Sequence, residues 1–159
     1  MYASPTSAPR LDSARGVGQR RAHDRALVHT CVRVRDPEAS MRFYGALGFE
    51  PRGRLKFSTA YNIYVGLPGD GDVLELTVNV GQEEPYDLGT GYNHMAITVD
   101  DIHAALAALE PLGVAPEKPP YHPGDREELP LIAFVADPDG YRIELIDGGE
   151  FPTPQDPAG

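Results

Sequence analysis

HTCVRVRD at residues 29–36 and HMAITVDD at residues 94–101 are two versions of one pattern, and together they decide the fold. When His29 is placed on His94, the chain aligns with itself well beyond these two segments. The further matched pairs are Val32 with Ile97, Val34 with Val99, Asp36 with Asp101, Gly48 with Gly113 and Pro51 with Pro116. A repeat of this length indicates that one supersecondary unit has been duplicated.

Each copy of the pattern predicts a strand followed by a helix. Apolar and polar residues alternate over 26–35 and 93–101, which is typical of half-buried strands. An aspartate then supplies a helix N-cap and a glycine marks the helix end, which predicts helices over 36–48 and 101–113. The remaining strands are expected at 53–60, 61–66 and 73–80, and on either side of the turn 137–140 within 129–147.

A carboxylate repeats along with the histidine. LEL at 74–76 matches IEL at 143–145, so each copy has one histidine on its first strand and one glutamate on its last. Strand parity places all four side chains opposite an apolar strand face. The four residues are His29, Glu75, His94 and Glu144. They would face one concave surface if each sheet packs its helix on the other side.

Two imidazoles and two carboxylates that face one space suit a divalent metal ion. Neutral histidine nitrogen and carboxylate oxygen bind ions such as zinc, nickel, cobalt and iron. Any one of these residues alone would most simply be a surface or hydrogen-bonded side chain. Their repetition in register favours ligation, and an ion that accepts six ligands keeps positions open for water or substrate oxygens.

The chain length and the apolar pattern fit one domain. We predict this domain at 26–148 of the 159 residues, with units at about 26–80 and 93–147. Residues 1–25 and 149–159 lack a periodic apolar pattern and are expected to be a disordered N-terminal tail and a flexible C-terminal tail. The chain has no run of 18 or more apolar residues, the length needed to cross a bilayer.

Charge and cysteine content narrow the possible partners and location. Residues 1–25 hold five Arg and two Asp, so that nine basic and 22 acidic residues remain in 26–159. Such a surface repels phosphate backbones, which disfavours nucleic-acid binding. Cys31 is the one cysteine, which excludes an internal disulfide and makes the reducing cytoplasm the expected location. We expect its thiol to fill space rather than to react.

The motifs resemble a known family. HTCVRVRD followed by FYGALGF (43–49), then LELTVN (74–79), LGTGYNHMAITVDD (88–101) and FVADPDGYRIELI (134–146), resemble glyoxalase I, or lactoylglutathione lyase, of the vicinal oxygen chelate superfamily. The resemblance covers about residues 28–147. It implies an α+β fold of two βαβββ units, with curled mixed sheets, helices outside and a homodimeric assembly.

The resemblance also implies a reaction and a ligand set. The reaction is the isomerisation of the hemithioacetal of methylglyoxal and a thiol to the D-lactoyl thioester. The implied metal ligands are His29, Glu75, His94 and Glu144, with Glu144 also the catalytic base. Nickel and zinc are the leading candidates for the ion, and cobalt is a further one.

The resemblance extends to assembly and substrate binding. Each metal site would form between the first unit of one subunit and the second unit of its partner. Arg33 and Asn79 match positions that bind the γ-glutamyl end of glutathione.

The loop 117–130 departs from the family pattern. Where bacterial members usually have a short basic, glycine-rich loop, this chain has the longer and largely acidic EKPPYHPGDREELP. Arg126 is the candidate replacement for the basic residues of that loop. The thiol could therefore be glutathione or another small thiol such as mycothiol. Two further hypotheses stay open, namely another isomerase or epimerase on this scaffold, and a non-catalytic dimer that sequesters a cationic drug.

Overall fold

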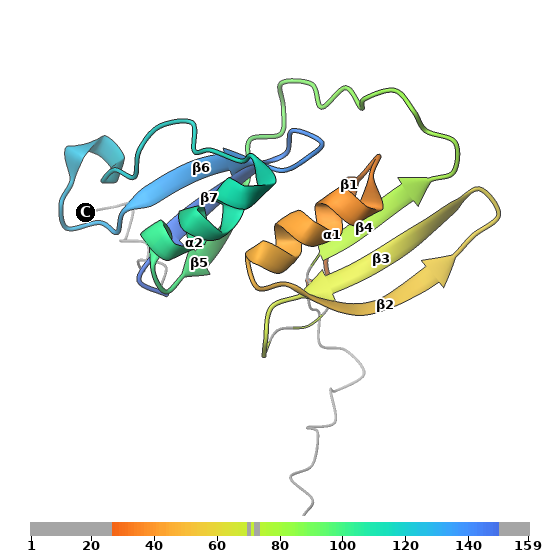
Figure 1. Cartoon of the computed structure of the whole chain (residues 1–159), viewed down its shortest axis with the longest axis horizontal. Helices are drawn as coiled ribbons and strands as arrows, with labels where there is room; N and C mark the ends of the chain where they lie inside the picture. Colours follow the sequence, from red (N-terminus) through yellow and green to blue (C-terminus); the bar gives the residue numbers. More distant parts are fainter. Residues whose placement is uncertain (1–26, 70, 72–73, 150–159) are drawn as a thin grey trace, which may run out of the picture.

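The computed structural model describes residues 27–69, 71 and 74–149, which form two units (Figure 1). Each unit has one sheet with one long helix lying across a face of it. The predicted tails at 1–25 and 149–159 lie outside the described residues, apart from Gly149. None of the helices formed by the described residues is long and apolar enough to cross a membrane.

The first unit consists of β1 (Thr30–Arg33), α1 (Pro37–Ala46), β2 (Glu50–Lys56), β3 (Ala60–Gly66) and β4 (Leu74–Asn79). Its sheet has the order β1-β4-β3-β2, with β1 parallel to β4 and the other neighbours antiparallel. In β4 the apolar residues are buried on the helix side, and the residues between them are half-buried on the other side. The predicted strand parity is therefore confirmed.

The second unit repeats this plan with β5 (Met95–Val99), α2 (Ile102–Leu109), β6 (Ile132–Ala136) and β7 (Arg142–Asp147). Short 3-10 turns lie at Glu110–Leu112 and Pro123–Asp125. The sheet has the order β5-β7-β6, with β5 parallel to β7. Because β5, β6 and β7 correspond to β1, β3 and β4, the predicted α+β fold of two related units is confirmed.

Both helices begin where the sequence predicts, but α2 ends at Leu109 and a 3-10 turn at Glu110–Leu112 leads on to Gly113. Asp36 and Asp101 each accept hydrogen bonds from the backbone N–H groups of the second and third helical residues. These bonds satisfy donors that have no partner within the helix. Gly48 follows α1 and Gly113 follows the 3-10 turn, with φ of +89° and +75°, a backbone conformation that glycine adopts without steric cost.

Strand β2 lies earlier in the chain than predicted. It covers Glu50–Lys56 rather than 53–60, because the chain turns at 57–59 and the N–H of Phe57 donates to the carbonyl of Ala60. Every residue of β2 is exposed, so its sequence lacks the alternation that would have placed it.

The second unit has three strands where the first has four. The segment 114–131 occupies the place of the missing strand in the chain order. Its backbone bonds to the sheet are scattered, namely the bridge between Tyr121 and Ile132 and single bonds from the N–H of Glu117 to the Phe134 carbonyl and from the N–H of Asp147 to the Leu131 carbonyl. The βαβββ plan that the resemblance implied for both units is therefore wrong for the second unit, whose segment contains Pro116, Pro119, Pro120 and Pro123. Proline has no N–H to donate to a neighbouring strand, so this segment cannot form a continuous ladder.

One apolar core joins the two units. Buried residues of α1, β3 and β4 and of α2, β6 and β7 belong to a single cluster. The turn between β6 and β7 also contacts the first unit directly, because the Tyr141 hydroxyl accepts a hydrogen bond from the N–H of Arg33, and Asp139 Oδ1 accepts one from the N–H of Arg35. The helices and this turn therefore hold the units together, which leaves the opposite sheet faces uncovered.

Candidate metal centre

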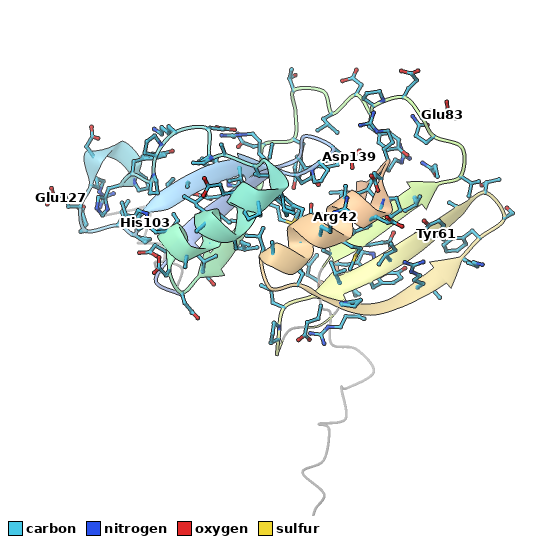
Figure 2. The ribbon with its side chains drawn as sticks, in the orientation of Figure 1. Arg42, Tyr61, Glu83, His103, Glu127 and Asp139 are labelled. Atoms are coloured by element: carbon cyan, nitrogen blue, oxygen red, sulfur yellow. The ribbon has the colours of Figure 1, made fainter. Side chains whose placement is uncertain are left out.

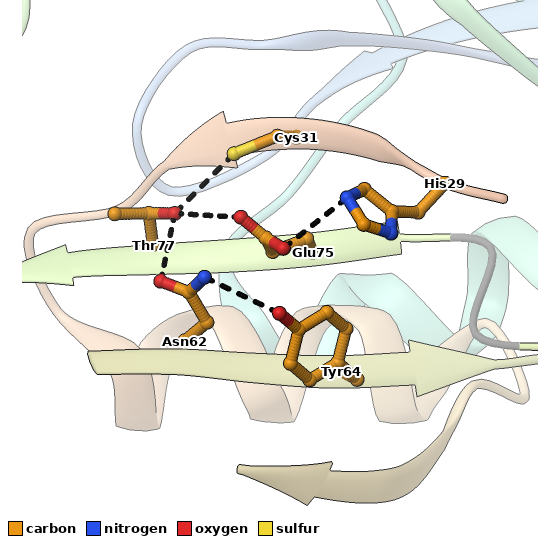
Figure 3. A network of polar contacts seen from close by, with 6 residues as sticks. All are labelled: His29, Cys31, Asn62, Tyr64, Glu75 and Thr77. Atoms are coloured by element: carbon orange, nitrogen blue, oxygen red, sulfur yellow. Dashed lines mark hydrogen bonds and ion pairs between the residues drawn. The ribbon is translucent and has the colours of Figure 1, made fainter. Parts of the chain in front are cut away.

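A histidine and a glutamate lie side by side in the first unit. His29 directly precedes β1, and Glu75 lies in β4, the parallel neighbour of β1. His29 Nε2 is 3.2 Å from Glu75 Oε2. The pair lies on the sheet face away from α1 and remains accessible, with the histidine side chain 31% and the glutamate side chain 12% exposed (Figure 3).

The second unit repeats this pair with the same register. His94 directly precedes β5, and its Nε2 is 3.0 Å from Oε2 of Glu144 in β7. In both units the strand residue two positions after the histidine pairs with the glutamate. Cys31 pairs with Glu75, and Ala96 pairs with Glu144. The structure therefore shows that the repeat seen in the sequence extends to the relative positions of the polar groups.

An aromatic ring flanks each pair from the third strand. Tyr64 in β3 and Phe134 in β6 pair directly with the glutamates. Their ring centroids lie 5.7 Å from that of His29 and 5.2 Å from that of His94, both in edge-on geometry. Each glutamate is thus enclosed between an imidazole on one side and an aromatic ring on the other.

The spacing within each pair fits two ligands of one ion. Two ligand atoms about 2.1 Å from an ion and at a right angle to each other are about 3.0 Å apart. The observed separations are 3.2 Å and 3.0 Å, which a direct hydrogen bond would also give. The donor set favours the ion, since one imidazole nitrogen and one carboxylate oxygen per unit are ligands that borderline divalent metals accept.

The two pairs do not meet within one chain. Among the described residues, no group of three or more His, Cys, Asp or Glu side chains could hold a metal ion. Each unit thus presents two of the four predicted ligands. A site with all four would have to combine His29 and Glu75 of one chain with His94 and Glu144 of another.

A polar network supports Glu75 (Figure 3). The Thr77 hydroxyl lies 3.2 Å from Glu75 Oε1 and 3.1 Å from Asn62 Oδ1, and the Cys31 thiol lies 3.3 Å from the same hydroxyl. Partial burial alone would raise the pKa of the Glu75 carboxyl, but hydrogen bonds from neighbouring side chains and the charge of His29 outweigh it and lower the pKa. Glu75 is therefore held as a carboxylate, the form that binds a cation.

A different network supports His94. Its Nδ1 lies 2.6 Å from Asn93 Oδ1, and Arg142 Nη1 donates to the same oxygen at 3.0 Å. Arg142 is itself bound by both carboxylate oxygens of Glu117. The two histidines of the repeat thus have matching Nε2 contacts and different contacts at Nδ1.

The predicted substrate-binding residues lie in separate places. Arg33 is exposed at the end of β1, and Asn79, at the end of β4, donates to the Tyr86 hydroxyl at 3.0 Å. Both belong to the first unit. Arg126 is 62% exposed in the loop after α2 and pairs with Glu128 at 2.7 Å. Its neighbour Glu127 lies at the far end of the second unit in Figure 2, so Arg126 does not approach the first-unit residues of its own chain.

Sequence patterns did not single out the residues that support the ligands. These are Asn62, Tyr64, Thr77, Asn93, Glu117, Phe134 and Arg142. Strand parity could have found two of them, since Thr77 follows Glu75 by two positions and Arg142 precedes Glu144 by two. Asn93 lies at the start of the alternating segment 93–101 and just before β5, and Glu117 lies in a loop; neither position indicates a contact with Arg142.

Comparison with known families gives one match over most of the chain. The model of the Glyoxalase/Bleomycin resistance protein/Dioxygenase superfamily matches residues 26–145. A probable lactoylglutathione lyase of Vibrio parahaemolyticus is 41% identical over 127 residues, which cover 76% of this chain and 88% of the relative. A lactoylglutathione lyase of Neisseria meningitidis serogroup A is 42% identical over 130 residues, with the same two coverages.

Solved structures show the same similarity. A trypanothione-dependent glyoxalase I of Leishmania major matches with a TM-score of 0.65 and 31% identity, over 79% of this chain and 88% of that one. A glyoxalase I of Zea mays matches with a TM-score of 0.66 and 28% identity over 80% of this chain. The match covers 46% of the maize chain, so this chain spans about half its length.

Proposed function

We infer the reaction from the premise that the chain belongs to the Glyoxalase/Bleomycin resistance protein/Dioxygenase superfamily and is an enzyme of the lactoylglutathione lyase type. It acts in methylglyoxal detoxification. The reaction is the metal-dependent isomerisation of the methylglyoxal–thiol hemithioacetal to the D-lactoyl thioester. The single observation that carries this proposal is the repeated histidine–glutamate pair, with the same register and nearly the same spacing in both units.

The ion would be held by His29, Glu75, His94 and Glu144. These residues fit a divalent ion by donor type and by spacing, and nickel or zinc, with cobalt as a further candidate, would suit them. When bound, such an ion would polarise the two substrate oxygens as a Lewis acid. The residues around the ligands restrict how these four side chains can move.

Glu144 would move the proton. It would take the proton from the carbon that bears sulfur and return one to the neighbouring carbon. The hydroxyl proton of the first carbon passes to the oxygen of the second, so that the first becomes the thioester carbonyl and the second the hydroxyl-bearing centre. Glu144 suits this role better than Glu75. Among the described residues its carboxylate has only the His94 imidazole within 4.0 Å as a polar partner, whereas Glu75 also accepts from Thr77. More of the lone pairs of Glu144 are thus free to take up a proton.

The active assembly would be a homodimer with two sites at its interface. In support, each unit carries half of a ligand set, and the two halves of one chain do not come together. Pairing the first unit of one chain with the second unit of another would complete a site, and the two-fold relation would generate a second one. The −10 formal charge disfavours nucleic acid as a further partner.

The thiol would be a small cytoplasmic one, with glutathione as the first candidate. Arg33 and Asn79 lie on the strands that carry the first ligand pair and would bind its γ-glutamyl end. Arg126 lies in the second unit, and each proposed site combines the first unit of one chain with the second unit of the other. The Arg126 side chain would therefore contact the other end of a thiol that Arg33 and Asn79 of the other chain bind. The acidic loop around Arg126 keeps other thiols, such as mycothiol, as candidates.

The proposal is tested with purified protein, methylglyoxal and a panel of thiols. The protein is stripped of metal and reloaded separately with nickel, zinc and cobalt. We expect thioester formation, followed by absorbance, that depends on the metal and prefers one thiol. Metal-free protein that forms thioester at the full rate, or loaded protein that is inactive with every thiol, would contradict the proposal.

A further inference from the structure

We propose that Asn93 is a positioning residue that holds the His94 imidazole in the tautomer whose Nε2 is free to bind a metal ion. The metal half of this inference rests on the proposed function. The other half, the position of the proton on His94, can be tested without any metal.

Arg142 fixes the orientation of the Asn93 amide. Arg142 Nη1 lies 3.0 Å from Asn93 Oδ1. A guanidinium group has only donors, so the amide atom that faces it must be the oxygen and not the nitrogen. The interchange of oxygen and nitrogen that is usually possible for an asparagine is therefore excluded at this position.

The fixed amide oxygen then determines the tautomer of His94. His94 Nδ1 lies 2.6 Å from the same Asn93 Oδ1. Because this oxygen can only accept, Nδ1 must carry the hydrogen. A neutral imidazole has one N–H, so Nε2 is left with its lone pair, 3.0 Å from Glu144 Oε2. Two acceptor atoms at this distance form no hydrogen bond with each other, and they suit a cation that both can bind. The nitrogen that would bind the ion is thus selected before the ion arrives.

Arg142 is itself held from two directions. Its Nε and Nη2 donate to Glu117 Oε1 and Oε2 at 2.6 Å and 2.8 Å. Its guanidinium also stacks on the Phe134 ring, 4.2 Å from the centroid. A bidentate pair and a stacked ring together restrict the guanidinium plane. Glu117 belongs to the loop that departs from the family pattern, so this loop acts on the metal site through Arg142.

The first unit offers an internal comparison. His29 Nδ1 is buried and has no hydrogen-bond partner among the described residues. No equivalent of Asn93 therefore selects the tautomer of His29. The inference predicts that the two histidines differ in proton position although their Nε2 contacts are alike.

The first experiment measures zinc affinity of the full chain by competition with a chelator. Asn93 is exposed, so substitution there leaves the core intact. Asn93→Ala should weaken zinc binding by about 10- to 100-fold, the range typical of lost outer contacts. Asn93→Asp keeps an acceptor for both partners and should stay within about tenfold of wild type. Equal affinity of Asn93→Ala and wild type, or no rescue by Asn93→Asp, would overturn the inference.

The second experiment locates the proton by nitrogen-detected NMR of the metal-free protein, at a pH where imidazole is neutral. We expect His94 to be protonated at Nδ1 in wild type and Asn93→Asp, and at Nε2, facing Glu144, in Asn93→Ala. Protonation at Nε2 in wild type would overturn the inference. If the wild-type protein bound no divalent metal but showed this proton pattern, the proposed function would fail and the positioning role of Asn93 would stand.

A matched pair of loop variants provides the control. Glu117→Ala removes the partner of Arg142, and Glu128→Ala removes the partner of Arg126 in the same loop. Glu117→Ala should weaken zinc binding and broaden the His94 Nδ1–H signal, whereas Glu128→Ala should match wild type in both. Equal effects of the two variants would show that the loop does not act through Arg142.

Discussion

The hydroxyl of Tyr44, in α1 of the first unit, donates to Oδ2 of Asp137, in the β6–β7 turn of the second, at 2.8 Å. Both residues are buried. The other carboxylate oxygen of Asp137 accepts from the N–H groups of Asp139 and Tyr141, both at 2.9 Å. One carboxylate thus closes the turn and ties it to the other unit.

Removing this carboxylate should destabilise the whole chain. Asp137→Ala leaves the buried hydroxyl of Tyr44 and two backbone N–H groups without their acceptor, and we expect it to lower the free energy of unfolding by about 2–4 kcal/mol. Tyr44→Phe removes one of the three bonds and should cost about 1 kcal/mol. Urea unfolding measures both. A larger loss for Tyr44→Phe than for Asp137→Ala would contradict this account.

The same carboxylate should give stability a defined pH dependence. Burial raises the pKa of Asp137 above its ordinary value of 3.8, although hydrogen bonds from Tyr44 and the turn oppose the shift. The folded state therefore binds this proton more tightly than the unfolded state, and the contribution falls as pH rises from 3.8 through the folded-state pKa. Asp137→Asn cannot titrate. As pH rises over this range, the free energy of unfolding of the wild type should fall relative to that of Asp137→Asn. A difference between the two proteins that stays constant with pH would contradict the raised pKa.

Glu144→Gln should separate catalysis from simple binding. The amide cannot take a proton, so turnover should fall at least about 100-fold, the scale of a lost general base. The control is Glu128→Gln, in an exposed pair of the same unit. If the protein sequestered a drug instead, ligand binding would survive Glu144→Gln, and no thioester would form in the wild type either.

Metal removal should abolish activity reversibly. With two sites per dimer, we expect one divalent ion per chain after reconstitution, measured by elemental analysis beside the rate. Glu75→Gln exchanges a carboxylate ligand for a neutral amide and should reduce both the bound metal and the rate. If that variant binds as much metal as the wild type, Glu75 is not a ligand.

The sequence was sufficient for the parts of the structure that repeat. The strand and helix that follow His29 and His94, the caps at Asp36 and Asp101, and the parity of β4 all follow from local patterns that burial reinforces. The strand register brings Glu75 and Glu144 beside their histidines, which is consistent with the four-ligand prediction. That the two pairs bind one ion between two chains is a proposal.

Other features depend on contacts that no single segment determines. Strand β2 is exposed on all residues and so lacks the alternation that would have located it. The sequence pattern predicted only two strands after α2, as the structure has them, whereas the resemblance implied a third, which the prolines at 116–123 prevent. The contact between Asn93 and Arg142 joins residues 49 positions apart and depends on a guanidinium orientation that Glu117 provides.

The central claim is that the two pairs serve one ion across a subunit boundary, and mixing two inactive variants tests it directly. His29→Ala and His94→Ala each damage every site of their own homodimers. A mixed dimer would contain one site with all four ligands and one that lacks both histidines. After subunit exchange, activity should return to about a quarter of wild type, because random pairing gives half mixed dimers with one complete site each. A mixture that forms mixed dimers but stays as inactive as its components would contradict the claim.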